Sequence, residues 1–192
     1  MGAPQAEPKV KGVAFRSIDV CFAELRGDAA RDRARELMPG GLRDLYKSGL
    51  VLASTWYPIS WYRDAFRAFR STTGDGVELA RQIGYQAAKR DMRSVYKLIF
   101  AKVVSPQTLL GMSSRLFSSY YDTGAFEVLE SRRGHVHVRL SGCTGWDQNM
   151  WTEIYGSCVS LLEIAGAKEV RIHVKSGGRD TDTAMELEAH WV

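Results

Sequence analysis

The pattern of apolar residues changes near residue 105, and this change constrains the fold more than any other feature of the sequence. Before it, apolar residues recur at helical spacing, as in the face formed by Ile59, Tyr62, Phe66 and Phe69. After a helix that starts at Pro106, the period becomes two in segments 124–130, 136–140, 169–174 and 184–192, with one long helix between the second and third. This order predicts an α+β fold: an N-terminal helical layer packed on an antiparallel sheet, with two C-terminal hairpins flanking one helix.

The length of 192 residues fits one domain. We expect residues 1–9 to form a flexible tail and residues 10–192 to form a single α+β domain, mainly helical over 10–104. An edge strand is predicted for Val10–Arg16, because the run is short and apolar. Helices are predicted over 28–38, 42–47, 58–70, from Asp75 onward, over 94–104, from Pro106 to Tyr121, and from Asp147 to Ala165.

Small residues form one face of the helix that follows Asp75. They are Ala80, Gly84, Ala87 and Ala88. Small side chains allow two helices to approach closely, and a homodimer with twofold symmetry is the commonest assembly built on such contacts. The sequence therefore predicts a homodimer, with burial of this face inside one chain as the alternative.

The composition excludes several classes of protein. The net charge is only +4, and no helix-turn-helix, zinc-finger or RNA-recognition motif occurs, which argues against nucleic acid as a partner. No apolar run is long enough for a membrane span, and the first residues lack a secretory signal. The three cysteines are far apart, as expected for free thiols in a reducing compartment, so we expect a cytoplasmic protein without a disulfide.

Two groups of residues in the helical half are candidates for binding. The aromatic residues Trp56, Tyr57, Trp61, Tyr62 and Phe66 could line a ligand or partner pocket, or form a corner of the core. On the same helix, a basic surface of Arg63, Arg67 and Arg70 could meet an acidic protein partner, or could simply face solvent.

All four histidines lie in the predicted strands. His135 and His137 point to one side of their strand, and His173 and His190 share the sheet. Several histidines on one face can bind a metal ion, but each stands opposite the apolar residues of its strand. We interpret them as part of a solvated or half-covered sheet face, and we expect no metal site.

Several segments carry a resemblance to known proteins. They are Ser105–Leu110, Arg115–Gly124, the helix with Gly156, Leu162, Glu163 and Gly166, and the last strand, which leads to Trp191. In these the chain resembles the fold group of 4-vinyl-reductase-like domains, haem-NO-binding domains and TRAPP trafficking subunits. With Trp56–Pro58 added, the whole chain resembles an uncharacterised family of myxobacterial type.

The cofactor sites that this resemblance implies are missing from the sequence. Haem-NO-binding domains hold iron through a histidine in the helical half and carry a Tyr-x-Ser-x-Arg motif, and this chain has neither. The 4-vinyl-reductase-like domains often have cysteines around the final hairpin, which here reads Ser176–Asp182 without one. We therefore expect no haem, no structural zinc and no other cofactor.

Motifs for catalysis are also absent, with neither a phosphate-binding GxxxxGK[ST] loop nor a Gly-x-Ser-x-Gly turn. The sequence favours a non-catalytic regulatory or adaptor module that binds a protein partner, with an apolar ligand pocket as an added feature. The alternative is a small-molecule sensor of the 4-vinyl-reductase-like type, and an enzyme is the reading with least support.

Overall fold

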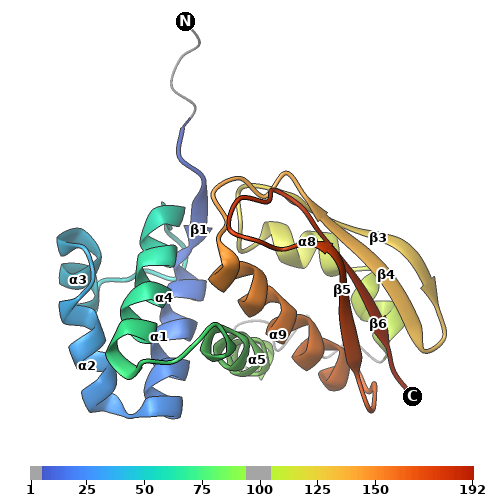
Figure 1. The fold of residues 1–192 in the computed structure, drawn as a ribbon, viewed down its shortest axis with the longest axis horizontal. Coiled ribbons are helices and arrows are strands. Elements are labelled where there is room, and N and C mark those ends of the chain that lie inside the picture. The colour runs from blue at the N-terminus through green and yellow to red at the C-terminus, as the bar shows by residue number, and fades with distance from the viewer. Residues whose placement is uncertain (1–5, 94–104) are drawn as a thin grey trace, which may run out of the picture.

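The computed structural model describes residues 6–93 and 105–192, and it confirms the predicted α+β class (Figure 1). Its N-terminal helices gather on one side, and a four-stranded sheet forms the other side. The elements of the first half are β1 (Lys9–Lys11), α1 (Gly12–Arg26), α2 (Asp28–Glu36), α3 (Gly40–Lys47), β2 (Trp56–Pro58), α4 (Ile59–Thr73) and α5 (Glu78–Arg93). Those of the second half are α7 (Pro106–Leu110), α8 (Ser113–Ser118), β3 (Ala125–Arg132), β4 (His135–Ser141), α9 (Gln148–Ile164), β5 (Arg171–Gly177) and β6 (Met185–His190).

The main sheet is antiparallel throughout, in the order β3-β4-β6-β5. Each predicted hairpin forms, and the two are joined because β4 pairs with β6, from His135 opposite His190 to Leu140 opposite Met185. Strands of period two place alternate residues on opposite faces. One face carries the apolar side chains that belong to the core; the other carries histidines and charged residues.

The long helix α9 crosses the apolar face of the sheet, with the small helix α8 beside it (Figure 1). The side chain of Asp147 accepts a hydrogen bond from the Met150 amide at 3.1 Å and so caps α9, as predicted. The predicted helix from Pro106 to Tyr121 is instead two short helices, α7 and α8, separated at Gly111 and Met112. The helix predicted over 94–104 lies outside the described residues.

The prediction of a strand over Val10–Arg16 was wrong, because α1 begins at Gly12. The amides of Gly12 and Val13 donate to the carbonyls of Thr55 and Ala53 at 2.8 and 3.1 Å, so the loop before β2 satisfies two of the free N–H groups of the first helical turn. Only Lys9–Lys11 pairs as a strand, with β2.

Part of the expected tail also makes defined contacts. The amide of Ile59 donates to the Pro8 carbonyl at 2.8 Å, and the amide of Ser60 donates to the Glu7 side chain at 3.0 Å. These contacts hold residues 7–9 against the start of α4.

The small-residue face of α5 packs against α9 inside the chain. A Cβ atom added to Gly84 would lie 2.0 Å from the Glu153 carbonyl oxygen, and one added to Gly156 would lie 2.1 Å from that of Arg81. Each glycine therefore lets its own helix approach the backbone of the other helix closely. This packing matches the alternative given above, that the small-residue face is buried inside one chain. The face therefore no longer supports a homodimer, which stays a prediction.

No helix among residues 6–93 and 105–192 is both long and apolar enough to cross a membrane.

Candidate functional site

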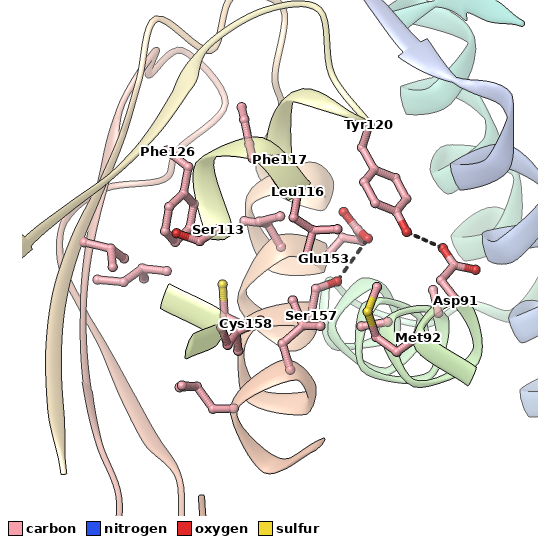
Figure 2. Close-up of a pocket in the computed structure, with 18 of the residues that line it drawn as sticks. Asp91, Met92, Ser113, Leu116, Phe117, Tyr120, Phe126, Glu153, Ser157 and Cys158 are labelled. Atoms are coloured by element: carbon pink, nitrogen blue, oxygen red, sulfur yellow. Dashed lines mark hydrogen bonds between the residues drawn. The ribbon is translucent and has the colours of Figure 1, made fainter. Parts of the chain in front are cut away.

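A cavity of about 110 Å³ lies between the helical layer and the sheet. Figure 2 shows α9 at its centre, α5 on one side, α8 above it and the strands on the other side. Aliphatic and aromatic side chains form most of its wall; among them are Leu116 and Phe117 of α8 and Phe126, Val136 and Leu187 of the sheet. The cavity exists because elements far apart in the sequence meet there without filling the space between them.

Two carboxyl groups, Asp91 of α5 and Glu153 of α9, interrupt this apolar wall, and both residues are buried. Asp91 accepts hydrogen bonds from the hydroxyls of Ser17 and Tyr120, the latter at 2.7 Å. Burial raises the pKa of Asp91, and these two hydrogen bonds oppose that effect.

Glu153 is the more perturbed of the two acids, because burial raises its pKa to about 7. Its Oε2 accepts a hydrogen bond from the Tyr121 hydroxyl at 3.1 Å, and its Oε1 lies 3.3 Å from the Ser157 hydroxyl. The Ser157 hydroxyl also lies 3.1 Å from the Gly84 carbonyl oxygen, but it has one proton to donate. If Glu153 is protonated on Oε1, its O–H donates to the Ser157 hydroxyl, which in turn donates to the Gly84 carbonyl. Each of these three groups then has a hydrogen-bond partner.

Cys158 is the one cysteine in the cavity wall; it is half-buried and adjoins Ser157 on α9. Cys21 and Cys143 are buried elsewhere, and all three thiols are free, as predicted. Burial raises the pKa of the Cys158 thiol to about 12, so it is a neutral thiol at physiological pH and contributes apolar surface to the cavity.

The aromatic residues proposed from the sequence do not form one pocket wall. Tyr62 lines the cavity, whereas Phe66 and Tyr57 pack in the core of the helical half. Trp61 packs against Gly41, and the Lys11 ammonium lies 4.5 Å from the centre of a Trp56 ring. The structure therefore brings one of these five side chains to the cavity.

The basic surface of α4 is less free than its spacing indicated. Arg67 is exposed and pairs with Asp64 at 3.0 Å. Arg70 donates to the side chain of Asn149 at 2.9 Å, and the Nε atom of Arg63 is buried. Of the three, only Arg67 is exposed, and within the described part of the chain it pairs with Asp64 of its own helix.

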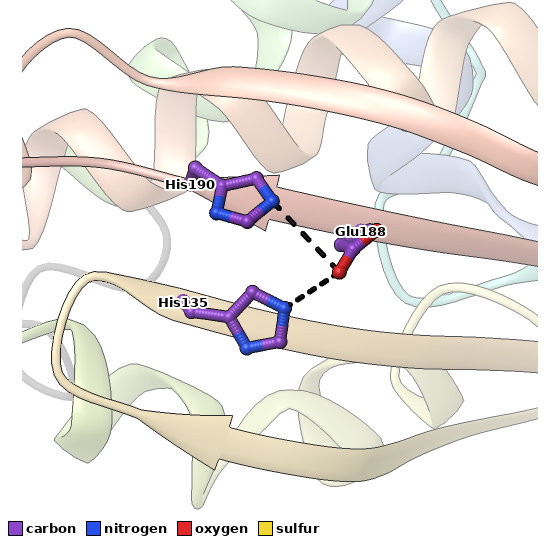
Figure 3. A group of neighbouring side chains, drawn as sticks. All are labelled: His135, Glu188 and His190. Carbon is purple, nitrogen blue, oxygen red and sulfur yellow. Dashed lines mark hydrogen bonds and ion pairs between the residues drawn. The ribbon is translucent and has the colours of Figure 1, made fainter.

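The four histidines lie, as predicted, on the sheet face opposite the apolar core. There His135, Glu188 and His190 come close together (Figure 3). This face is on the far side of the sheet from the cavity.

Sequence reasoning missed the residues that give the cavity its chemistry: Asp91, Tyr120, Glu153 and Ser157. A signal for Glu153 was present, since it lies on the inward face of α9, one turn from Met150. An ionisable residue on an apolar helix face is rarely buried without a partner, so it marks a position worth examining.

No family model matches the sequence, and no curated protein matches it. The resemblance to a family of myxobacterial type is therefore unsupported. The fold does match solved structures. The Fe(II) unliganded H-NOX protein from K. algicida is 13% identical, with a TM-score of 0.72, covering 95% of this chain and 96% of that one.

Two other H-NOX structures agree. A single-residue variant of Tt H-NOX is 13% identical, with a TM-score of 0.72 over 94% of both chains. An oxygen-binding H-NOX domain related to soluble guanylate cyclases, in its oxygen complex, is 12% identical, with a TM-score of 0.63 over 94% of both chains. The chain thus has the fold of H-NOX domains over nearly its whole length, which confirms the haem-NO-binding branch of the predicted fold group.

Proposed function

We propose that the protein is a sensor domain that binds a small, largely apolar molecule in the cavity between α5, α8, α9 and the sheet. The observation that carries the proposal is the cavity itself, of about 110 Å³, with an apolar wall and two buried carboxyl groups. An engineered apolar cavity of about 150 Å³ stays dry and binds benzene, so this space suits a ligand of similar or smaller size. The likeness in fold to an oxygen-binding H-NOX domain supports a small-molecule ligand for this chain.

Haem does not fit the residues present. The chain has four histidines, and all are on the outer face of the sheet, so none reaches the cavity. The Cys158 thiol, whose pKa is raised to about 12, is poorly suited to ligate iron as a thiolate. The described lining residues include two acids and no Lys, Arg or His, which is the wrong charge for a dianionic porphyrin edge.

The same charges define the class of ligand. An anion would have to lie near Asp91 and Glu153 in a low-dielectric space, where like charges repel strongly. A neutral molecule with a hydroxyl or amine group can instead donate a hydrogen bond to a carboxyl oxygen. We infer an uncharged or amine-bearing ligand with an apolar body.

The regulatory reading from the sequence remains part of this proposal. In it, ligand binding alters the capture of a protein partner. Arg67 is the candidate contact residue, because it is exposed and, among the described residues, pairs with Asp64 on its own helix.

The test uses three probes of similar size: benzene, phenol and benzoate. A ligand at ten times its Kd stabilises a protein by about 1.4 kcal/mol, which for this chain length corresponds to a rise in Tm of about 3–6 °C. We expect benzene and phenol to raise the Tm and benzoate to leave it unchanged. Equal stabilisation by benzoate and phenol would contradict the ligand class.

Cavity-filling variants locate the binding. Cys158→Phe fills the space from α9, and Ser113→Phe fills it from α8, so either should abolish the effect of benzene on the Tm. Cys158→Ala is the matched control, because it enlarges the cavity and should retain the effect. If both Phe variants fold and still respond to benzene, the ligand binds elsewhere.

A further inference from the structure

The outer face of the sheet carries a row of histidines and acids that cross its central strands. His135 of β4 is directly opposite His190 of β6, and the two ring centres are 4.8 Å apart. Glu188 lies two residues before His190 on the same face of β6. The register of the two strands therefore brings both rings and one carboxylate to a single spot (Figure 3).

One carboxylate oxygen faces both rings. Oε1 of Glu188 is 2.8 Å from Nε2 of His135 and 3.8 Å from Nε2 of His190. The other oxygen, Oε2, accepts a hydrogen bond from the Lys175 ammonium at 3.2 Å. Lys175 thus orients the carboxylate and leaves Oε1 directed at the imidazoles.

The surroundings of His135 are unusual for a solvated histidine. Its side chain is only 6% exposed, and its Nδ1 atom is buried with no hydrogen-bond partner among the described residues. The nearest carboxylate oxygen to Nδ1 belongs to Glu130, at 3.9 Å. A histidine that binds a metal through Nε2 carries its proton on Nδ1 and usually donates it to a carboxylate, which is the role Glu130 is placed to take.

We propose that His135, Glu188 and His190 form a binding site for a divalent transition-metal ion of the zinc type. The three ligand atoms lie within 4.8 Å of one another. Two nitrogens that are each about 2.1 Å from one ion can be at most about 4.2 Å apart, so a small rotation of a ring completes the site. His190 is half-exposed and lies at the end of β6, so it is free to make that rotation.

Two imidazoles and one carboxylate are a ligand set that zinc accepts with a fourth position open to water. The proposal replaces our sequence-based reading of these three residues as part of a plain solvated face. It is independent of the proposed function, because the site is on the opposite face of the sheet from the cavity.

The same sheet provides a matched control. Nε2 of His137 is 3.0 Å from Oε2 of Glu186, a cross-strand pair like that of His135 and Glu188. There the second neighbour of the carboxylate is the Arg139 guanidinium at 2.7 Å, rather than a second histidine. Both carboxylates have a cation on one oxygen, but among the described residues Glu186 has no second imidazole beside it. His137 and Glu186 therefore supply only two ligands and should not form a site.

The experiment is a titration of the full chain, free of any histidine tag and treated with EDTA, with Zn²⁺ in a calorimeter and with Co²⁺ by visible absorption. We expect one ion per chain with a Kd below about 10 µM. His190→Ala and Glu188→Gln should each weaken binding by more than about 100-fold, and Glu130→Gln by about 10–100-fold, as for other partners of a ligating histidine. His137→Ala should bind as the unmodified chain does.

Each outcome decides the proposal. Binding that is lost in His190→Ala and kept in His137→Ala, with unchanged Tm values for both metal-free variants, supports it. Failure to bind Zn²⁺ or Co²⁺ below about 1 mM overturns it, because exposed carboxylates and histidines then explain whatever binding remains. An equal loss in His190→Ala and His137→Ala overturns it too, since that result describes diffuse binding to the face.

Discussion

Replacing Glu153 by Gln tests the buried acid at the cavity directly. Gln is nearly the same shape and can keep the observed contacts, accepting from Tyr121 through its oxygen and donating to Ser157 through its amide. The substitution removes only the ability to ionise. Any pH-dependent difference between the two proteins therefore reports the cost of charging Glu153.

The sign and size of the effect follow from its pKa. The pKa of Glu153 is 4.5 in its ordinary state, which we take for the unfolded chain, and about 7 in the folded chain. Between these two pH values the folded state therefore binds more protons than the unfolded state. Stability is then lost as pH rises from about 4.5 through about 7. A shift of this size corresponds to about 3 kcal/mol once Glu153 is fully ionised in both states, at about 1.4 kcal/mol per unit.

The assay is urea unfolding at pH 5 and pH 8. At pH 5 the two proteins should differ little, and at pH 8 Glu153→Gln should be more stable by up to about 3 kcal/mol, or a midpoint higher by about 1–3 M urea. Glu163→Gln, an exposed position on the same helix whose carboxylate accepts a hydrogen bond from Tyr85, is the matched control for replacing a carboxyl by an amide. Asp91, whose negative charge also raises the pKa of Glu153, makes a second check, because Asp91→Asn should shrink the pH 8 difference. The reasoning fails if Glu153→Gln changes stability equally at both pH values.

Two further predictions concern packing. Gly84→Ala should lower the Tm by about 4–10 °C, because overpacking against a backbone carbonyl of α9 costs about 1–3 kcal/mol or more, whereas Gly76→Ala, with open space around it, should lower it by less than about 2 °C. Equal effects would show that α5 and α9 separate at little cost. Arg70→Ala should reduce the free energy of unfolding by about 1–3 kcal/mol in urea, because buried Asn149 loses its donor, while Arg67→Ala should change it by less than about 0.5 kcal/mol. A larger effect at Arg67 would contradict the assignment of Arg67 as the solvent-facing member.

The sequence predicted the second half of the fold well because its signals there are local. Asp147 and Gly166 bound α9, and the alternation in 136–140 is regular, so few alternatives fit. The start of the chain was harder. The apolar run at Val10–Phe15 reads as a strand, but the carbonyls of Ala53 and Thr55, distant in sequence, favour a helix. Helix and strand propensities depend on neighbouring residues, so they cannot predict this contact between distant residues.

The cavity could not be predicted from any one segment. It depends on the spacing between α5, α8, α9 and the sheet, which is set by packing between distant residues. The aromatic residues of β2 and α4 were a reasonable choice, since large rings fill both pockets and cores, yet of the five only Tyr62 lines the cavity, and Tyr57 and Phe66 fill the core. The sequence places His135, Glu188 and His190 on strands, but it does not show that they are neighbours. Only the register that sets His135 opposite His190 brings them together.

The close approach of α5 and α9, with Gly84 against the Glu153 backbone and Gly156 against that of Arg81, makes one wall of the cavity stiffer than the other. Where backbone meets backbone at these glycines, no side chain lies between the helices to rearrange, so we expect α5 and α9 to move together as one body. The sheet meets α9 through side chains, with the cavity lying between them. We therefore expect a ligand that is too large or too small to be accommodated by a tilt of the sheet against this helix pair. Such a tilt would carry the outer face of the sheet with it, and so would report the contents of the interior on the surface.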